Sequence, residues 1–509
     1  MDRKWWTLGA VCIGIFMLLL DLTIVNVALP DIEHDLAASL GDLQWIIDAY
    51  ALTLAALLLT SGSLADLLGR RIVFAAGIVV FTLGSLLCGL STGPLFIILA
   101  RGFQGIGGAI MFATSLALLA YAFRGRERGT AFAVYGAVTG IAVAIGPVLG
   151  GVITSGLSWR WIFFVNIPIG AVALGVTLTK VDESRNPDAS RPDWAGFATF
   201  SACLGALIYG LIESTSHGFG TAAVIGALIA AAVLFGAFIL VEHLQKEPML
   251  DFSLLRKPTF SGGLVAAFGV NASIFALFTY LILYLQNALG LSAVATGVRF
   301  LLLTGPTFVT AAIAGRLTTK VPIKWLISGG FLITAVGIIL MTGIKASSSW
   351  SHLATGFVVS GVGIGLVNVP LASTAVGVVE PAQSGMASGI NSTLRQVGTA
   401  TGIAALGSIF SSTVRSHVVA SLSATPLRAS ASRIAMKVAN GAGAPRGGRG
   451  GLDHVVERAA LGGFVHGLNL ILWIGAVVAF VAAALCLVLI REKDFTASHT
   501  GKDTSVAAA

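Results

Sequence analysis

The sequence predicts an all-α integral membrane protein with fourteen transmembrane helices. Two observations lead to this fold class. Only 11% of the 509 residues are charged, against roughly 25% in soluble proteins, so the chain cannot cover itself with a polar surface. The mean hydropathy is +0.91, and the apolar residues fall into runs close to the ~20 residues that a membrane helix needs. A soluble enzyme and a disordered chain are both excluded.

The positions of the basic residues predict how the apolar runs cross the membrane, because Lys and Arg concentrate in short cytoplasmic loops. With the N-terminus inside, 19 of the 31 Lys and Arg residues lie in cytoplasmic segments, and only two lie in short outer loops. We therefore expect both termini on the cytoplasmic side of the plasma (inner) membrane. The runs are 5–29, 44–65, 72–91, 95–123, 130–155, 161–179, 194–213, 221–243, 260–286, 293–315, 323–344, 352–379, 384–411 and 463–490.

Ionisable side chains inside the spans are the first candidates for function, since each costs at least ~2.5–3.5 kcal/mol at the bilayer centre. Asp21 lies roughly 12 Å below the outer end of the first span, and Arg101 lies roughly 9 Å below that of the fourth. The matching depths allow an ion pair. Asp21 is either locked to Arg101 or carries a proton, because burial favours the neutral acid and a nearby arginine the charged one. Asp48 lies only about 6 Å down the second span, where it is either hydrated or shares the proton.

The segment after the second span combines glycines, an acid and two arginines in an expected cytoplasmic loop. Gly62, Asp66 and Gly69 precede Arg70 and Arg71. Glycines allow a tight turn and close helix approach, and Asp66 is placed to cap and charge-match the next helix. An ordinary cytoplasmic loop needs only the arginines, so this spacing predicts a gating role.

The fifth span carries a face of small residues, Gly136, Gly140, Gly146, Gly150 and Gly151, together with Pro147. Small residues let helices approach closely in lipid, and proline kinks a helix. The face serves either generic helix packing or a specific role in transport.

Six segments carry the pattern of a known family, namely Leu20–Pro30, Gly62–Arg71, Arg101–Ala109, Gly140–Gly151, Trp159–Gly170 and Tyr284–Ser292. Their order and spacing resemble the major facilitator superfamily, specifically its fourteen-span drug:proton antiporter family. The resemblance implies a major facilitator fold, with six-helix bundles at 1–185 and 251–495 and two inserted helices at 186–250. A faint repeat between 62–71 and 315–324 agrees with two related bundles around a central site.

This resemblance implies proton-driven export of amphipathic, often cationic, compounds from the cytoplasm. In the family the first-span acid and the fourth-span arginine take part in coupling, which carries over to Asp21 and Arg101. The loop with Asp66 helps to hold the outward-facing state, and the glycines of the fifth span limit leak. The alternatives are an exporter of a lipid or a cell-envelope or secondary metabolite on the same scaffold, and a passive facilitator.

The second bundle departs from the exporters of multivalent cations in this family, which tend to carry acids there. Spans nine to fourteen hold no acid in their interiors, only Arg299 and Arg395. Arg395 lies about 16 Å into the thirteenth span, where it meets either an anionic group of a substrate or a polar partner such as Gln396 or backbone carbonyls. A dication is therefore disfavoured as substrate. The candidate substrate contacts are Asn26, Gln104, Asn271 and Arg395.

An ion gradient is the expected energy source, because the sequence has no phosphate-binding loop. The four cysteines lie in apolar runs without metal-ligand spacing, so we expect neither a metal nor a cofactor. The expected partners are a small amphipathic substrate and membrane lipids, and the chain is expected to be a monomer. The net charge of +8 orients the protein and does not indicate nucleic-acid binding. A long outer loop at 412–462, with a Gly-rich stretch at 441–451, and a disordered cytoplasmic tail at 496–509 complete the prediction.

Overall fold

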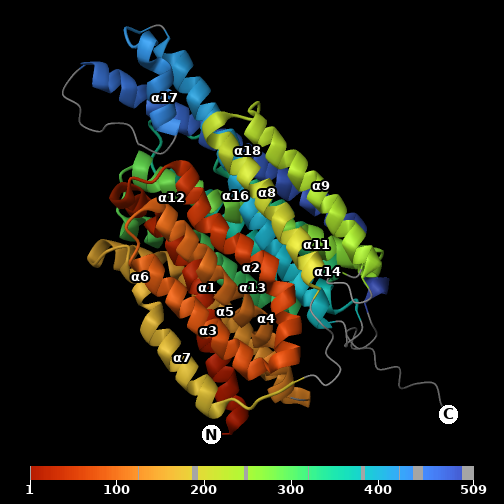
Figure 1. Ribbon diagram of the computed structural model, residues 1–509. Helices are drawn as coiled ribbons and strands as arrows, with labels where there is room; N and C mark the ends of the chain where they lie inside the picture. The colour runs from red at the N-terminus through yellow and green to blue at the C-terminus, as the bar shows by residue number, and fades with distance from the viewer. Residues whose placement is uncertain are drawn as a thin grey trace, which may run out of the picture.

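The computed structural model describes residues 2–123, 125–185, 193–245, 250, 252–318, 320–379, 384–423, 425–439 and 451–495. Within these ranges the chain forms helices and connecting turns, without strands. Thirteen helices in the described ranges are long and apolar enough to cross a membrane, and the bent helix α2 raises the number to fourteen when its two parts count as one span. In Figure 1 the N-terminus lies at one end of the bundle and α17 at the other. We call these the N-terminal end and the capped end.

Helices α1 to α7 form what we call the first half. Local signals in the sequence set several of its boundaries. Ser39 and Asp42 form a capping box at the start of α2, and Pro94 stands at the start of α4, where its fixed φ suits a helix. The bounds are α1 Arg3–Leu36, α2 Leu40–Leu68, α3 Arg70–Gly89, α4 Pro94–Ala122, α5 Gly125–Gly156, α6 Trp161–Phe164 and α7 Asn166–Lys180.

Helices α8 and α9 connect the first half to α10–α18, which we call the second half. The rod from α11 to η2 contains two π-helical turns, η1 and η2, a distortion that is frequent at functional sites. The bounds are α8 Trp194–His217, α9 Ala222–Leu244, α10 Phe252–Leu255, α11 Pro258–Val270, η1 Asn271–Phe275, α12 Ala276–Leu283, η2 Tyr284–Ala288, α13 Ala293–Leu317, α14 Ile323–Leu340, α15 Ser351–Val376, α16 Ser384–Leu422, η4 Arg428–Ser430, α17 Ala431–Ala439, α18 Gly451–Leu489 and η5 Glu492–Asp494.

The two halves share a hydrophobic core toward the capped end. The largest core joins the second-half helices to residues 20–32 of α1 and 40–47 of α2. A separate core contains residues 8–18 of α1 and 50–58 of α2 together with other first-half helices, and the described residues that form it include none from the second half. Apolar packing therefore joins the halves toward the capped end, whereas the N-terminal end of the first half is packed mainly within itself.

Two boundaries differ from those expected. Helix α1 continues past Leu29 to Leu36 and carries Pro30 inside it. The expected loop at 62–71 is almost wholly helical, since α2 runs to Leu68 and α3 begins at Arg70. Gly69 alone makes the turn, with a φ of +114° that only glycine adopts without strain.

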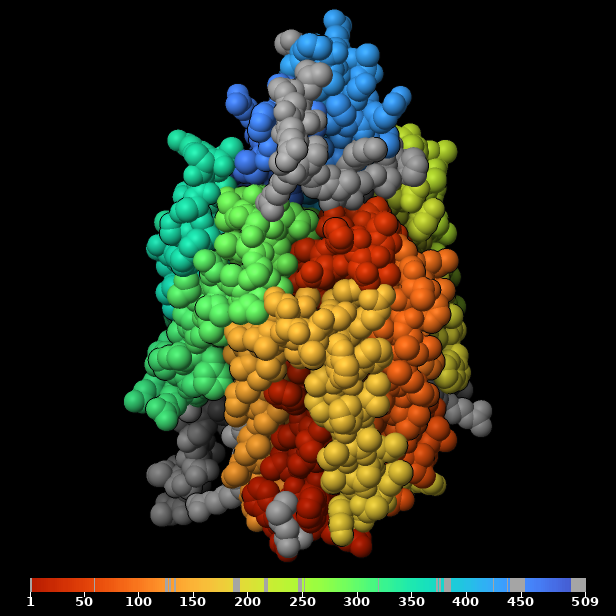
Figure 2. Space-filling model, turned by 90° about the vertical axis from the view of Figure 1, so that its left-hand side faces the viewer, coloured from red at the N-terminus to blue at the C-terminus, as the bar shows by residue number. Residues whose placement is uncertain are grey.

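Much of the expected outer loop at 412–462 is also helical. Helix α16 has 39 residues, or about 58 Å, so it is much longer than the ~30 Å hydrocarbon core of a bilayer. Together with α17 and the start of α18, it forms a cap that stands above the other helices in Figure 2. Residues 440–450 and the tail at 496–509 lie outside the described residues, so the expectations for the Gly-rich stretch and the tail are not addressed.

Candidate functional site

A buried ion pair between α1 and α4 lies at the centre of the candidate site. Arg101 Nη1 lies 2.5 Å from Asp21 Oδ2, and the two residues are 1% and 0% exposed. The contact that the helix depths allowed is therefore present. Gln104 completes a triangle, because its Oε1 accepts a hydrogen bond from Arg101 at 2.7 Å and its Nε2 donates to Asp21 Oδ1 at 3.0 Å.

Neighbouring helices complete the surroundings of Arg101. Its Nε donates to the Ile46 carbonyl of α2 at 3.1 Å, and its guanidinium carbon lies 4.2 Å from the centre of the Tyr50 ring. The thiol of Cys88 on α3 donates to Gln104 Oε1 at 3.6 Å. Buried charges are tolerated only when they are paired and hydrogen-bonded in this way. Neutralising Asp21 would leave the guanidinium without its counter-ion, so this geometry can link a proton to a rearrangement of three helices.

Asp48 is buried, so of the two alternatives left open for this residue, hydration at the membrane surface does not fit the structure. The residue is 0% exposed, and neither carboxylate oxygen has a hydrogen-bond partner among the described residues. It lies one helical turn after Gln44, whose Nε2 donates to Tyr280 Oη at 3.0 Å and to the Ile403 carbonyl at 3.3 Å. Depth along a helix did not reveal that this face of α2 packs against the second half. An acid in this position is held more easily in its neutral form.

The glycine face of α5 lies between α1 and α13. A Cβ at Gly146 would lie 1.9 Å from Thr23 Oγ1, and one at Gly150 would lie 2.9 Å from the Ile24 side chain. On the side facing α13, a Cβ at Gly151 would lie 2.5 Å from the Ala293 carbonyl oxygen. The close helix approach predicted for this face is present at these positions but not at Gly136, where a Cβ would meet no atom within 4 Å.

The other two positions of the motif differ in their surroundings. Pro147 is buried inside α5, and its carbonyl oxygen lies where a Cβ on Gly297 of α13 would have to be. Gly140 faces the second half less tightly, since a Cβ there would lie 3.2 Å from the Phe308 ring. The motif therefore brings α5 against one helix of its own half and one of the other.

The turn between α2 and α3 is stabilised differently from the prediction. Asp66 does not cap α3; it forms an ion pair with Arg70 at 2.8 Å. The cap comes from Glu183, in the segment after α7, whose carboxylate accepts the backbone N–H groups of Arg71 at 3.0 Å and Ile72 at 3.3 Å. Its negative charge matches the positive end of the α3 dipole. Gly62 lies inside α2, where a Cβ would meet no atom within 4 Å.

The candidate substrate contacts fall into two groups. Gln104 is fully buried in the Asp21–Arg101 triangle, so it supports the ion pair and offers no open surface. Asn26 and Asn271 are half-buried and bridge helices: Asn26 Oδ1 accepts from Thr279 Oγ1 at 3.1 Å, and Asn271 Oδ1 accepts from Thr399 Oγ1 at 3.3 Å.

Arg395 lies on α16, one turn before the threonine that bonds η1. Its side chain is partly exposed, and the guanidinium forms no hydrogen bond or ion pair with any residue that the structure describes. The expected pairing with Gln396 or with backbone carbonyls is not found among them. An unpaired charge at this depth makes Arg395 a candidate functional residue.

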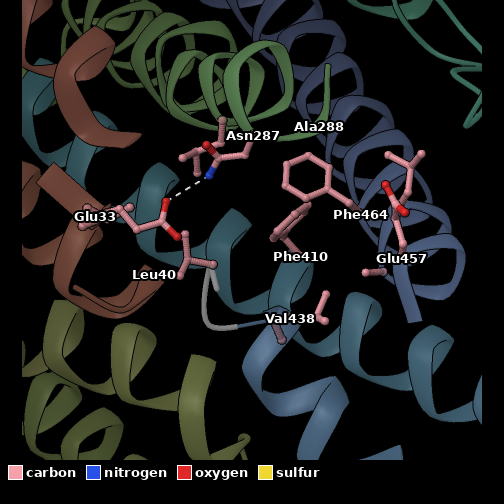
Figure 3. Close-up of a pocket in the computed structure, with 13 residues that line it drawn as sticks. Glu33, Leu40, Asn287, Ala288, Phe410, Val438, Glu457 and Phe464 are labelled. Carbon is pink, nitrogen blue, oxygen red and sulfur yellow. Dashed lines mark hydrogen bonds between the residues drawn. The ribbon is translucent and has the colours of Figure 1, made fainter. Parts of the chain in front are cut away.

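Polar contacts join the two halves toward the capped end. Gln286 Nε2 donates to the Val27 carbonyl at 2.9 Å, and Asn287 Nδ2 donates to Glu33 Oε2 at 3.0 Å, the bond drawn in Figure 3. Both residues belong to η2, so this π-helical turn adds two polar contacts to the one that Thr279 of α12 makes with Asn26 of α1. No local pattern in the sequence indicated these contacts, because they depend on how the halves pack.

The comparison with protein families identifies the family of this protein and its fold. Residues 11–403 match the Major Facilitator Superfamily. The chain belongs to this superfamily. It is a multi-pass membrane transporter and not an enzyme, and the all-helical structure is a major facilitator fold.

Several major facilitators resemble the chain along most of its length. The puromycin resistance protein pur8 of Streptomyces alboniger is 34% identical over 98% of this chain and 94% of its own. The tetracenomycin C resistance and export protein of Streptomyces glaucescens is 33% identical over 95% and 91%. The multidrug resistance protein Stp of Mycobacterium tuberculosis is 34% identical over 81% and 78%.

Solved structures of other transporters share the fold at low sequence identity. A bacterial homologue of the human lysosomal transporter Spinster, in an inward-facing and occupied conformation, superposes with a TM-score of 0.62 at 15% identity, over 97% of this chain and 99% of its own. The human organic anion transporter MFSD10 gives 0.59 at 15% identity, over 96% and 100%.

Proposed function

We propose that this major facilitator exports amphipathic small molecules, antibiotics among them, across the plasma membrane in exchange for protons and by alternating access. The single observation that carries the proposal is the buried triangle of Asp21, Arg101 and Gln104. The relatives named for puromycin resistance, tetracenomycin C export and multidrug resistance support a drug as cargo. The distribution of Lys and Arg supports cytoplasmic termini.

A chain of direct contacts leads from the triangle to the second half. Arg101 donates to the Ile46 carbonyl of α2, and Gln44, two residues earlier on the same helix, bonds Tyr280 and Ile403 of the second half. Protonation of Asp21 removes the charge that holds Arg101 in place. In the proposed cycle the arginine then shifts, α2 moves with it, and the contacts toward the capped end are released.

The energy of a proton gradient is sufficient for such a cycle. One charge moved across 100 mV releases about 2.3 kcal/mol, so one or two protons per cycle sustain a useful concentration gradient of the drug. Arg395 is a proposed contact for an acidic group of the cargo, and the half-buried Asn26 and Asn271 are proposed polar contacts beside it. A doubly charged cation remains disfavoured as cargo. Arg395 is itself positively charged, and the described residues of α11–α16 include no buried acid that would balance a second cation.

The second candidate is export of a secondary metabolite or of a lipid or cell-envelope compound on the same scaffold. The relative named for tetracenomycin C export favours this possibility. Co-purification of a specific lipid or metabolite with the protein would favour it over a general drug pump.

The test uses purified protein in liposomes with an imposed pH gradient. Monocationic, neutral and anionic amphiphiles are added, and compound-dependent proton flux is followed for the native chain and for Asp21→Asn. We expect proton flux with at least one compound. In Asp21→Asn we expect this flux to fall by about a hundredfold or more, because an amide cannot take up and release the proton that a carboxylate carries.

Glu492→Gln is the matched control, since this exposed acid lies in η5, outside the long helices. It should pump like the native protein, and size-exclusion chromatography should show that both variants are folded. Normal flux in Asp21→Asn would overturn the proposed role of Asp21. Absence of flux with every compound would favour the second candidate.

A further inference from the structure

A cavity at the capped end lies between the two halves and beneath the cap. It has a volume of about 70 Å³. Its walls come from α1, α2 and α12 to η2, and from the cap helices α16, α17 and α18. The cavity lies beside the bond between Glu33 and Asn287 (Figure 3), and none of Asp21, Arg101 and Gln104 lines it. It is therefore a site separate from the proton-coupling triangle.

The walls carry two carboxylates. Glu33 comes from α1 and Glu457 from α18. Asn287 occupies one oxygen of Glu33, and the other oxygen accepts no hydrogen bond from a described residue. Glu457 lies 3.7 Å from His454, a longer contact than a hydrogen bond. No Lys or Arg belongs to the lining in the part of the chain that the structure describes, so the ionisable groups of the described lining are acids, which attract cations.

Aromatic rings separate the two acids. Phe410 and Phe464 stand between Glu33 and Glu457 in Figure 3, with ring centres 4.9 Å apart and planes at 78°. Aromatic faces attract organic cations, above all substituted ammonium groups. Because the rings hold the carboxylates apart, several oxygens cannot converge on one ion, as Ca²⁺ or Mg²⁺ would require.

We propose that this cavity binds the substituted ammonium group of an organic cation. The volume fits such a group: at about 15 Å³ for each water, it has room for roughly five water-sized groups, which matches a nitrogen and its methyl substituents but not a whole drug. The apolar remainder of the ligand lies outside this volume. Resting on the proposed export function, the site holds the cationic end of a cargo molecule as it leaves.

Binding to the purified full-length protein tests this site without any transport. Ligand-observed saturation-transfer NMR measures the binding of choline and of dimethylbutanol, its neutral isostere in which carbon replaces the nitrogen. We expect choline to bind and the isostere not to bind. Glu457→Gln should weaken choline binding by at least about tenfold through loss of a charge-assisted contact, and Phe464→Leu should weaken it about threefold while keeping an apolar wall.

Glu492→Gln is the control variant and should bind choline like the native chain. Equal binding of the isostere, or unchanged binding in both Glu457→Gln and Phe464→Leu, overturns the inference. Choline binding in a protein that shows no proton-coupled flux overturns the export proposal but leaves the ammonium site standing.

Discussion

Arg101 joins three helices through one side chain. Its guanidinium reaches Asp21 on α1 and the Ile46 carbonyl on α2 while it extends from α4. Arginine can do this because its planar group presents several donors in fixed directions, whereas lysine offers a single ammonium on a flexible stem. The site therefore depends on the shape of this residue as well as on its charge.

Arg101→Lys should accordingly fold but pump poorly. The positive charge remains to balance Asp21, yet one ammonium cannot reach Asp21, Gln104 and Ile46 together. We expect proton-coupled export to fall by at least about tenfold, the equivalent of one charge-assisted hydrogen bond. Rates in liposomes and the thermal unfolding temperature measure the two effects. Arg3→Lys, at an exposed ion pair with Asp182, is the control, and full activity in Arg101→Lys would show that charge alone suffices.

For single residues, the sequence was sufficient where the argument needed only the depth of a residue along its own helix. Depth arithmetic brought Asp21 and Arg101 to the same level, and it could have included Gln104, which lies three residues after Arg101 on the same helix face. It left open whether Asp48 is hydrated, because burial there comes from the second half, and it missed Tyr50, whose contact with Arg101 depends on how α2 rotates. Both failures concern packing between helices, which a single sequence does not specify.

At the scale of elements, α5 acts as a joint between the halves. Its glycines let the backbone approach α1 on one side and α13 on the other. Without side chains in these positions, dispersion and Cα–H contacts hold the helices together in lipid. The sequence predicted this close approach from glycine spacing alone, but it could not name the partner helices.

Gly151→Ala should separate α5 from α13. The added Cβ would lie 2.5 Å from the Ala293 carbonyl oxygen, a backbone atom that cannot rotate away, so we expect a loss of about 1–3 kcal/mol in stability from overpacking. Thermal unfolding followed by size-exclusion chromatography measures it, and proton leak in liposomes reports the loosened joint. Gly136→Ala is the matched control on the same helix, since its Cβ would meet nothing within 4 Å. Equal effects of the two changes would contradict this account.

At the start of α3, prediction from the local sequence identifies the wrong capping residue. Asp66 is near in sequence and was expected to cap this helix, but it pairs with Arg70. Glu183 reaches the helix start from more than a hundred positions away and accepts two of its N–H groups. A local motif identifies the need for a cap, whereas the residue that supplies it is set by the tertiary fold.

At the scale of the whole molecule, the halves are joined toward the capped end. The shared core includes the ends of α1 and α2 that lie there, and the Glu33–Asn287 and Val27–Gln286 bonds lie beside it. The opposite ends of α1 and α2 belong to a core within the first half. A transporter that works by alternating access must break these capped-end contacts once per cycle, so the proposed mechanism predicts that a covalent link there stops export.

A cross-link between the halves tests that prediction. In Glu33→Cys with Asn287→Cys, a short, reducible thiol cross-linker would join α1 to η2, because the tips of the native side chains, Glu33 Oε2 and Asn287 Nδ2, lie 3.0 Å apart. The four native cysteines are buried and should not compete. We expect export to stop in the linked protein and to return on reduction to the level of the unlinked double variant, which separates the effect of the link from that of losing Glu33.

Asp35→Cys with Arg160→Cys is the matched control, since this ion pair at the same end lies within the first half, and linking it should leave export unchanged. Continued export with the halves linked would mean that they do not part at the capped end, and alternating access in the proposed form would be wrong.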